Sequence, residues 1–213
     1  MGVDRGRERE GAMPRRMEQS RDALRARAVE LARDLVTTEG LPGLTIRRIA
    51  AGLGCSVGTV YNLFVDLDDI VLHVAALVVD DLHAALFAPG LPEEPAAALT
   101  EIARRYIRFS AEQPRTWAMV FEHEPGHDRP TPAWHLDRIA GLLAAVRAAA
   151  APAFPPGADS GQLAASIDVL WASVHGIAVL AGKGKLGFVT TANAEALADR
   201  LVATFLRGVR AEA

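Results

Sequence analysis

Apolar residues recur three and four positions apart along most of the chain, which is the spacing of one face of an α-helix. The first such stripe holds Leu24, Ala28, Leu31 and Leu35, and Gly40 is placed to end that helix. Alternation of apolar and polar residues, the pattern of a half-buried strand, is nowhere long enough to predict one. The pattern therefore predicts an all-α protein of about nine helices.

Two short helices joined by a tight turn are predicted in the run TIRRIAAGLGCSVGTVYNLF, which extends from Thr45 to Phe64. The hydroxyl of Thr45 can cap the first helix, and Gly54 can take the positive φ that ends it. Ser56 can cap the second helix in the same way. The stripe that this second helix buries is predicted at Val57, Val60, Tyr61 and Phe64.

The opposite face of the second short helix carries small and polar groups, at Gly58, Thr59 and Asn62. A helix that buries one stripe and presents short polar groups on the other suits the major groove of DNA. The pair of helices therefore predicts a helix-turn-helix that reads DNA.

Proline, glycine and aspartate mark where the later helices begin and end. Asp66 is predicted to cap a long helix that reaches about Phe87, and a break at residues 89–92, Pro-Gly-Leu-Pro, follows it. Beyond the break the predicted helices are one that carries Leu99 to Ser110, then 115–121, 133–151, 160–181 and 194–209.

These elements predict three segments along the chain. They are a flexible basic arm at 1–19, a three-helix DNA-binding domain with the helix-turn-helix at 20–66, and a helical effector-binding and dimerisation domain at 67–213, whose helix 67–87 is the connection. For Arg15 and Arg16 of the arm two readings stay open: contact with a phosphate or the minor groove, or a solvated tail.

Charge is divided unevenly between the two parts of the chain. Residues 1–65 hold 11 Lys and Arg against 8 Asp and Glu, whereas the remainder holds 12 against 18. The basic excess thus lies with the predicted helix-turn-helix, where phosphates would be neutralised.

Composition narrows the setting in which the protein acts. Half of the residues are hydrophobic, which is enough for a substantial core. Cys55 is the single cysteine, so an intrachain disulfide is excluded and a reducing cytoplasm is favoured. Because the N-terminus lacks the apolar core of a signal peptide and no uncharged stretch approaches about 18 apolar residues, we expect a cytoplasmic protein with no membrane partner. No cofactor is expected.

A metalloprotease pattern, H-E-x-x-H, occurs at residues 123–127 as HEPGH. That site requires both histidines on one helix face, and the central Pro-Gly disfavours a helix. We predict an exposed loop there and no metal ligand. The alternative left open is a loose metal site that uses Glu122, His123, His127 or Asp128.

A dinucleotide-binding pattern, G-x-G-x-x-G, occurs at residues 182–187 as GKGKLG. The motif works between a strand and a helix, but here a long amphipathic helix is predicted before it. We predict a loop between two helices.

Residues 21–70 resemble the DNA-binding domain of the tetracycline-repressor (TetR) family of bacterial transcriptional regulators. The resemblance rests on the helix TIRRIA at 45–50, on GCS at 54–56, on GTVY at 58–61 and on Phe64. In addition, Trp171, His175 and Gly176 resemble the Trp-His-Gly signature of one class of C-terminal domain in that family.

This resemblance implies a homodimer that places two recognition helices in successive major grooves of a palindromic operator. It also implies a small-molecule effector that binds the C-terminal domain and changes the affinity for DNA. The DNA contacts implied by the matching positions are Thr45, Arg47, Ser56, Gly58, Thr59, Tyr61 and Asn62. Of these, Tyr61 and the hydroxyls are expected mainly at phosphates, whereas Gly58, Thr59 and Asn62 face the bases. For two of these residues an alternative to DNA contact stays open. The Tyr61 ring could belong to the core with only its hydroxyl outside, and Arg47 could be a charge exposed to solvent.

The sequence departs from the family at the start of the connecting helix. The family commonly has a lysine just after the Phe that corresponds to Phe64, whereas this chain reads VDLDD at 65–69. Three carboxylates close to a phosphate backbone predict weaker binding to DNA.

The C-terminal part holds all three tryptophans. The residues predicted to line an apolar effector site are Tyr106, Trp117, Phe121, Trp134, Trp171 and His175. The alternative for each aromatic residue is simple core packing. On helix 160–181 a face of small residues, which includes Ala165, Ala172 and Gly176, predicts a dimer surface together with Leu197, Leu201 and Phe205 of the last helix.

The leading hypothesis is a ligand-responsive DNA-binding regulator, a repressor rather than an enzyme. One alternative is a small metal-dependent hydrolase that uses the loop at 123–128. The other is a helical binding module without specific recognition of DNA, which the acidic run at 66–69 favours.

Overall fold

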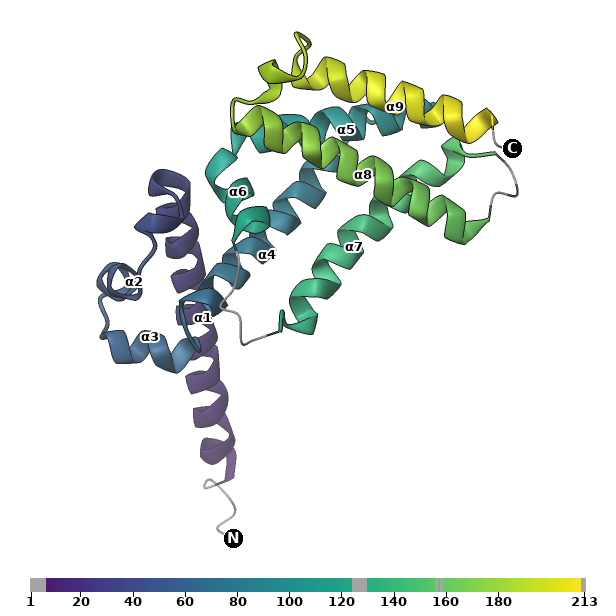
Figure 1. Ribbon diagram of the computed structural model, residues 1–213. Helices are drawn as coiled ribbons and strands as arrows, with labels where there is room; N and C mark the ends of the chain where they lie inside the picture. The colour runs from purple at the N-terminus through teal and green to yellow at the C-terminus, as the bar shows by residue number, and fades with distance from the viewer. Residues whose placement is uncertain (1–6, 124–129, 156, 158, 212–213) are drawn as a thin grey trace. The chain divides into compact units, whose positions relative to one another are not determined.

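The computed structural model describes residues 7–123, 130–155, 157 and 159–211, and within these ranges it holds nine α-helices and no strand (Figure 1). The predicted all-α class is confirmed. The chain divides into two compact units, Met1–Ala75 and Ala76–Ala213, and the division falls inside α4 (Leu67–Leu86). The sequence had placed this boundary just before that helix.

The N-terminal unit is built from α1 (Arg7–Glu39), the 3₁₀ turn η1 (Leu41–Gly43), α2 (Ile46–Leu53), α3 (Val57–Leu63) and the first half of α4. Its core is formed by apolar residues that are at most 8% exposed. They include Ala28, Ala32 and Val36 of α1, Ile49 and Ala50 of α2, Val60, Leu63 and Phe64 at α3, and Ile70, Val71 and Val74 of α4.

The first helix begins earlier than the sequence predicted. Residues 7–19 are helical, whereas the sequence divided the chain at residue 20; residues 1–6 lie outside the described part, and the flexibility of the arm at 1–19 stays a prediction. The segment has no apolar stripe, but it is rich in arginine and glutamate, which favour a helix, although Gly11 and Pro14 do not.

The turn of the helix-turn-helix has the hydrogen bonds of a Schellman motif. Gly54 lies in the left-handed region (φ 67°, ψ 33°), where its N–H donates to the carbonyl of Ala51 and the N–H of Cys55 donates to the carbonyl of Ala50. Thr45 at the other end accepts from the backbone N–H of Arg48 at 3.3 Å. Both ends of α2 are therefore fixed by the residues that the sequence singled out.

The buried stripe of α3 differs from the predicted one. Val60, Leu63 and Phe64 are the buried residues, whereas Val57 is 38% and Tyr61 54% exposed. Both stripes fit helical spacing, and the packing against α1 and α2 selects the one that includes Leu63. The prediction that Tyr61 and Val57 belong to the core is therefore wrong, and the Tyr61 ring belongs to the outer surface.

The C-terminal unit packs α6 (Pro114–Glu122), α7 (Ala133–Ala150), α8 (Ser160–Gly182) and α9 (Ala194–Ala211) around α5 (Pro95–Glu112). The short turns η2 (Ala151–Ala153) and η3 (Leu186–Phe188) follow α7 and α8. One apolar cluster runs through the unit, and α5 contributes the largest share of its aromatic and branched residues. An ion pair of Arg104 with Asp199, at 2.6 and 2.7 Å, joins α5 to α9.

By length and composition α8 could cross a membrane, with a mean hydropathy of 1.7 over its most apolar window. Only 28% of that window is buried inside the unit. Core helices of folded domains pass the same test, so this is weak evidence for a span. What the low burial does show is that α8 has an apolar face that the described part of the chain leaves uncovered.

Candidate nucleic-acid interface and ligand site

The outer face of α3 carries the residues predicted to contact DNA. Gly58, Tyr61 and Asn62 are exposed, and Thr59 is half-buried at the edge of the same face. Their side chains are small or polar except for the tyrosine ring, whose exposure now makes it available to a groove or a phosphate. We call Gly58, Thr59, Tyr61 and Asn62 the reading face.

The two predicted hydroxyl contacts also hold the helices in shape. The Ser56 oxygen accepts from the backbone N–H of Thr59 at 3.1 Å and lies 2.9 Å from the Thr59 hydroxyl. Ser56 and Thr45 are both exposed at helix N-termini, where free backbone N–H groups and the helix dipole favour an anion. Each residue can thus cap its own helix and still contact a phosphate.

The neighbouring arginines of α2 have different roles. Arg48 makes an ion pair with both carboxylate oxygens of Glu39 at 2.5 Å and donates to the carbonyl of Gly43 at 2.9 Å. The hydrogen bond from Arg48 lowers the pKa of Glu39. Arg47 is exposed, and no hydrogen bond or ion pair holds it within the part of the chain that the structure describes. Arg47 is thus the one of the two that is open to an external anion.

The acidic start of α4 is used mainly inside the unit. An Asp66 oxygen accepts from the N–H of Asp69 at 2.8 Å, and an Asp69 oxygen accepts from the N–H of Val65 at 3.1 Å, which is a capping box. Asp69 also lies 3.8 Å from Arg25 and 3.6 Å from His73. These two carboxylates thus have a structural role at the start of α4, and Arg25 offsets part of the charge of Asp69.

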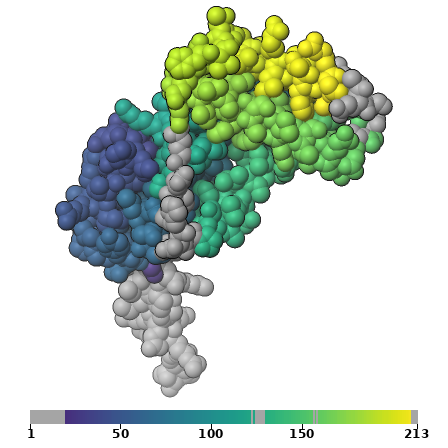
Figure 2. Space-filling model, in the orientation of Figure 1, coloured from purple at the N-terminus to yellow at the C-terminus, as the bar shows by residue number. Residues whose placement is uncertain are grey.

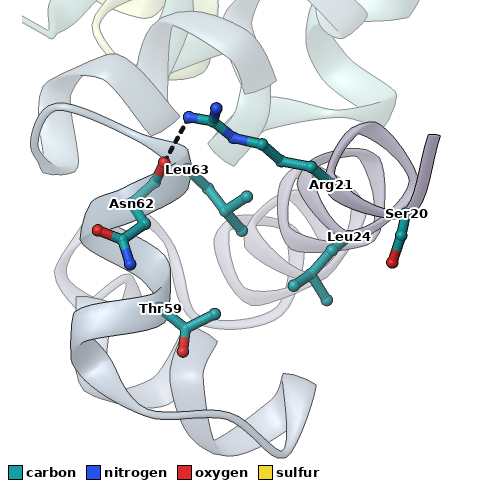
Figure 3. Close-up of a pocket in the computed structure, with 6 residues that line it drawn as sticks. All are labelled: Ser20, Arg21, Leu24, Thr59, Asn62 and Leu63. Carbon is teal, nitrogen blue, oxygen red and sulfur yellow. Dashed lines mark hydrogen bonds between the residues drawn. The ribbon is translucent and has the colours of Figure 1, made fainter. Parts of the chain in front are cut away.

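An open hollow of about 560 Å³ lies between α1 and α3, next to the reading face (Figure 3). Leu24 and Leu63 point toward each other between the helices and form its floor, as Figure 3 shows. Its polar lining comes from Ser20, Arg21, Thr59 and Asn62. Arg21 reaches across and donates to the backbone carbonyl of Asn62 at 2.7 Å.

Five of the six predicted effector residues come together in the C-terminal unit. Tyr106 of α5, Trp117 and Phe121 of α6, and Trp171 and His175 of α8 form one aromatic cluster, with ring centroids of neighbouring pairs 4.5–6.3 Å apart. Tyr106 and Trp117 are 1% and 3% exposed, whereas Phe121 is 38% exposed. The cluster therefore extends from the core to the surface.

Hydrogen bonding within the cluster is uneven. The Tyr106 hydroxyl lies 2.8 Å from Nδ1 of His175, and burial raises the pKa of the phenol, so it stays protonated at neutral pH. The Trp117 indole is close enough to that hydroxyl to oppose part of this rise, yet within the part of the chain that the structure describes its N–H makes no hydrogen bond. A buried donor without an acceptor is a free-energy cost that a bound molecule can remove.

The sixth predicted residue lies outside the cluster. Trp134 is 37% exposed at the start of α7, where its ring packs against that of His135. Trp134 is the second residue of α7. It was included among the predicted effector residues because it is an aromatic residue of the C-terminal part, and not because any pattern placed it near the others.

The two catalytic-looking motifs have different outcomes. Residues 124–129 lie outside the described part, so the arrangement of the HEPGH motif stays a prediction; the described residues hold no group of three metal-ligating side chains. Residues 182–187 run from the last residue of α8 into η3, which is the predicted connection between two helices.

The side of α8 away from the core is open. Val169 is 64% exposed, Ala165 and Ala172 are exposed, and a Cβ built on Gly176 would meet no atom within 4 Å. Figure 2 shows atoms of α8 and α9 (green to yellow) at the surface of this unit on the side in view. Leu197, Leu201 and Phe205 of α9, which were predicted to share the dimer surface, are half-buried and pack against the unit's own core.

The sequence did not point to Ser20 and Arg21 as part of the interface. They are 41 residues or more from Asn62 in the sequence, and only the packing of α1 beside α3 brings them to the reading face. No local pattern marks such a pair.

Comparison with known proteins gives a family match for the C-terminal unit. The profile of a family described as "Tetracyclin repressor-like, C-terminal domain" matches residues 99–205, which is half of the chain. That description does not mention a Trp-His-Gly class, so the assignment of Trp171, His175 and Gly176 to it stays a prediction. No curated protein matches the chain.

Solved structures resemble most of the chain. A protein of unknown function from Rhodococcus sp. RHA1 has 22% identity and a TM-score of 0.70, with 87% of this chain and 95% of that one covered. A TetR-family transcriptional regulator from Streptomyces coelicolor has 20% identity, a TM-score of 0.61 and coverage of 90% and 83%. RolR in complex with the ligand resorcinol has 20% identity, a TM-score of 0.64 and coverage of 90% and 89%. These similarities show the fold.

Proposed function

The chain belongs to the family of tetracycline-repressor-like transcriptional regulators, and from that premise we propose that it binds a palindromic DNA operator as a homodimer and represses transcription. A small hydrophobic effector binds the C-terminal unit and releases the protein from DNA. The protein acts in the cytoplasm and catalyses no reaction.

The observation that carries the DNA-binding role is the exposed reading face on a firmly capped helix. Ser56 fixes the start of α3 and Gly54 fixes the turn before it, while Asn62 and Tyr61 point away from the core. A rigid helix with amide and hydroxyl groups on its outer face suits hydrogen bonding to base edges. Arg47, Thr45 and the N-terminus of α3 add phosphate contacts that set the register.

The effector is proposed to bind at the aromatic cluster. Tyr106, His175 and the Trp117 N–H supply hydrogen-bonding groups within an apolar surround, which is the usual chemistry of a small-molecule site. RolR, which shares the fold, has been crystallised with resorcinol. An aromatic effector with oxygen substituents would suit the cluster in this chain as well.

The second copy of the chain is proposed to cover the open face of α8. Val169 and the small residues at 165, 172 and 176 leave an apolar surface on which another helix can pack closely. A partner subunit also explains why a helix with so little burial lacks charges along this face. Lipid is the alternative partner, and the oligomeric state in detergent-free buffer distinguishes the two.

The test of this function is a comparison of specific and nonspecific binding. Duplexes selected from a random pool provide the specific probe, and a mixed-sequence duplex is the reference. Asn62→Ala and Thr59→Ala are expected to lose the preference for the selected duplex, by about 1–3 kcal/mol for each base contact removed. Thr38→Ala, an exposed threonine of α1, is the control. Equal preference in all four proteins would show that the reading face is wrongly assigned.

The hydrolase alternative has a separate test. A metal-dependent enzyme must retain its metal, so elemental analysis of the purified protein decides it. A stoichiometric bound metal that Glu122→Gln or His123→Ala removes would contradict the assignment as a regulator alone.

A further inference from the structure

We propose that the hollow between α1 and α3 binds a phosphodiester of the DNA backbone, and that Arg21 is its principal ligand. This inference rests on the proposed DNA-binding function and adds a site on α1 to it. Within α1, the sequence offered only Arg15 and Arg16 as candidate contacts to DNA, and Arg21 was not among them.

The position of the hollow links it to the DNA. Thr59 and Asn62 belong both to the lining of the hollow and to the reading face. A duplex whose bases lie against the reading face must therefore pass one sugar-phosphate strand along the flank of α3. The hollow lies on that flank (Figure 3).

The lining has the chemistry of a sugar-phosphate site. Leu24 and Leu63 offer an apolar floor for a deoxyribose, while the Ser20 hydroxyl and the Arg21 guanidinium offer donors for a phosphate oxygen. The six residues that line the hollow include one cation and no carboxylate. The site is thus suited to an anion with an apolar neighbour, which describes a nucleotide backbone better than a free ion.

Arg21 is held in place for this role. Its Nη2 donates to the carbonyl of Asn62 at 2.7 Å, in the last turn of α3, where helix carbonyls lack partners. A guanidinium has five N–H donors, so one bond to a carbonyl leaves others for a phosphate. Because Arg21 is already fixed against the recognition helix, less side-chain freedom is lost when a phosphate binds.

The experiment measures binding of a mixed-sequence duplex at several salt concentrations, with full-length wild type and three variants. Arg21→Gln keeps an amide donor for the Asn62 carbonyl but removes the charge, whereas Arg21→Lys keeps the charge. Arg27→Gln is the matched control, because Arg27 is an exposed arginine of α1 about 120° around the helix from Arg21 at ~3.6 residues per turn.

The expected result is a change in salt dependence for one variant alone. For Arg21→Gln the slope of log affinity against log salt falls by about 0.9 per protomer bound, which is a loss of about 8-fold per protomer at 0.1 M salt. Arg21→Lys and Arg27→Gln keep the wild-type slope. The loss is equal for every duplex sequence, unlike the loss in Asn62→Ala.

Other results overturn the proposal in distinguishable ways. If Arg21→Gln and Arg27→Gln have the same slope as wild type, the phosphate site is wrong and the DNA-binding function stands. If Arg21→Gln and Arg21→Lys both lose helicity or melting temperature without a change of slope, Arg21 only supports α3. If millimolar inorganic phosphate at constant ionic strength binds wild type through Arg21 but does not weaken its binding to DNA, the hollow is a free-anion site that DNA does not use. If wild type binds no duplex at low salt, the proposed function itself fails.

Discussion

The unpaired N–H of Trp117 leads to an unusual prediction for Trp117→Phe. The side chain is 3% exposed, and truncating a buried tryptophan to alanine costs about 3–5 kcal/mol. Phenylalanine retains an aromatic ring at this position, so we assign roughly 1–2 kcal/mol to the smaller ring. The substitution also removes the buried indole N–H, which has no acceptor among the described residues, and this stabilises the folded state by about 1–3 kcal/mol. The two contributions nearly cancel, and Trp117→Phe should unfold within about 1 kcal/mol of wild type.

Tyr106→Phe is the matched comparison, since it removes a polar group that is paired. The hydroxyl lies 2.8 Å from Nδ1 of His175 in the same cluster, and the ring is 1% exposed. Its loss should destabilise the protein by about 1–2 kcal/mol, through the hydrogen bond and the nitrogen left without it. The smaller chemical change thus has the larger effect on stability.

Urea denaturation followed by circular dichroism at 222 nm measures both variants without using tryptophan emission. A loss of more than about 3 kcal/mol in Trp117→Phe would refute the reasoning, because a cost of that size implies that the indole N–H has a partner. A stable Trp117→Phe variant with weaker binding of an oxygen-bearing aromatic compound such as resorcinol would agree with a donor that is used by the effector.

Three further predictions concern the rest of the chain. Gly54→Ala should destabilise the helix-turn-helix by about 1–2 kcal/mol, because the left-handed backbone (φ 67°) is unfavourable for alanine, while a Cβ there meets no atom within 4 Å. Gly54→Asn should cost less, and equal stability of all three proteins in thermal melts would contradict this. Burial alone would raise the pKa of Glu101, but hydrogen bonds from Arg105 and Arg108 lower it. Its stabilising effect is therefore present above about pH 4.3 and is lost as the pH falls through the lowered value. Glu101→Gln should be less stable than wild type at pH 7, by a gap that narrows as the pH is lowered, and a gap independent of pH would refute the assignment. Val169→Asp should convert a dimer to a monomer in light scattering, because each dimer would bury two unpaired carboxylates, which costs roughly 3 kcal/mol or more. The control Leu136→Asp, on α7, should leave the measured mass unchanged.

Local chemistry explains why the helix-turn-helix could be predicted from its sequence. Thr45, Ser56 and Gly54 act on backbone groups within four residues, so their hydrogen bonds depend little on the rest of the fold. The capping role of Asp66 was predictable for the same reason. The hydrogen bonds that Asp66 and Asp69 accept from backbone N–H groups are equally local, but the run of three aspartates read only as negative charge.

Longer-range packing explains what the sequence could not provide. The apolar spacing on α3 fits two stripes, and only contact with α1 and α2 shows that Leu63 is buried and Tyr61 exposed. The pairing of Tyr106 with His175 joins residues 69 positions apart, and Arg21 meets Asn62 across 41. Trp134 was grouped with the effector residues on composition, and the fold leaves it outside the cluster.

The central claim is that this chain reads a palindromic DNA sequence through α3. Selection of duplexes from a random pool by the purified protein, followed by sequencing, tests it most directly. We expect an enriched inverted repeat whose half-sites are centred about 10 base pairs, or a multiple, apart, as two recognition helices of a dimer require. Failure to enrich any sequence at low salt, with helicity and oligomeric state intact, would contradict it and favour a helical binding module without specific recognition of DNA.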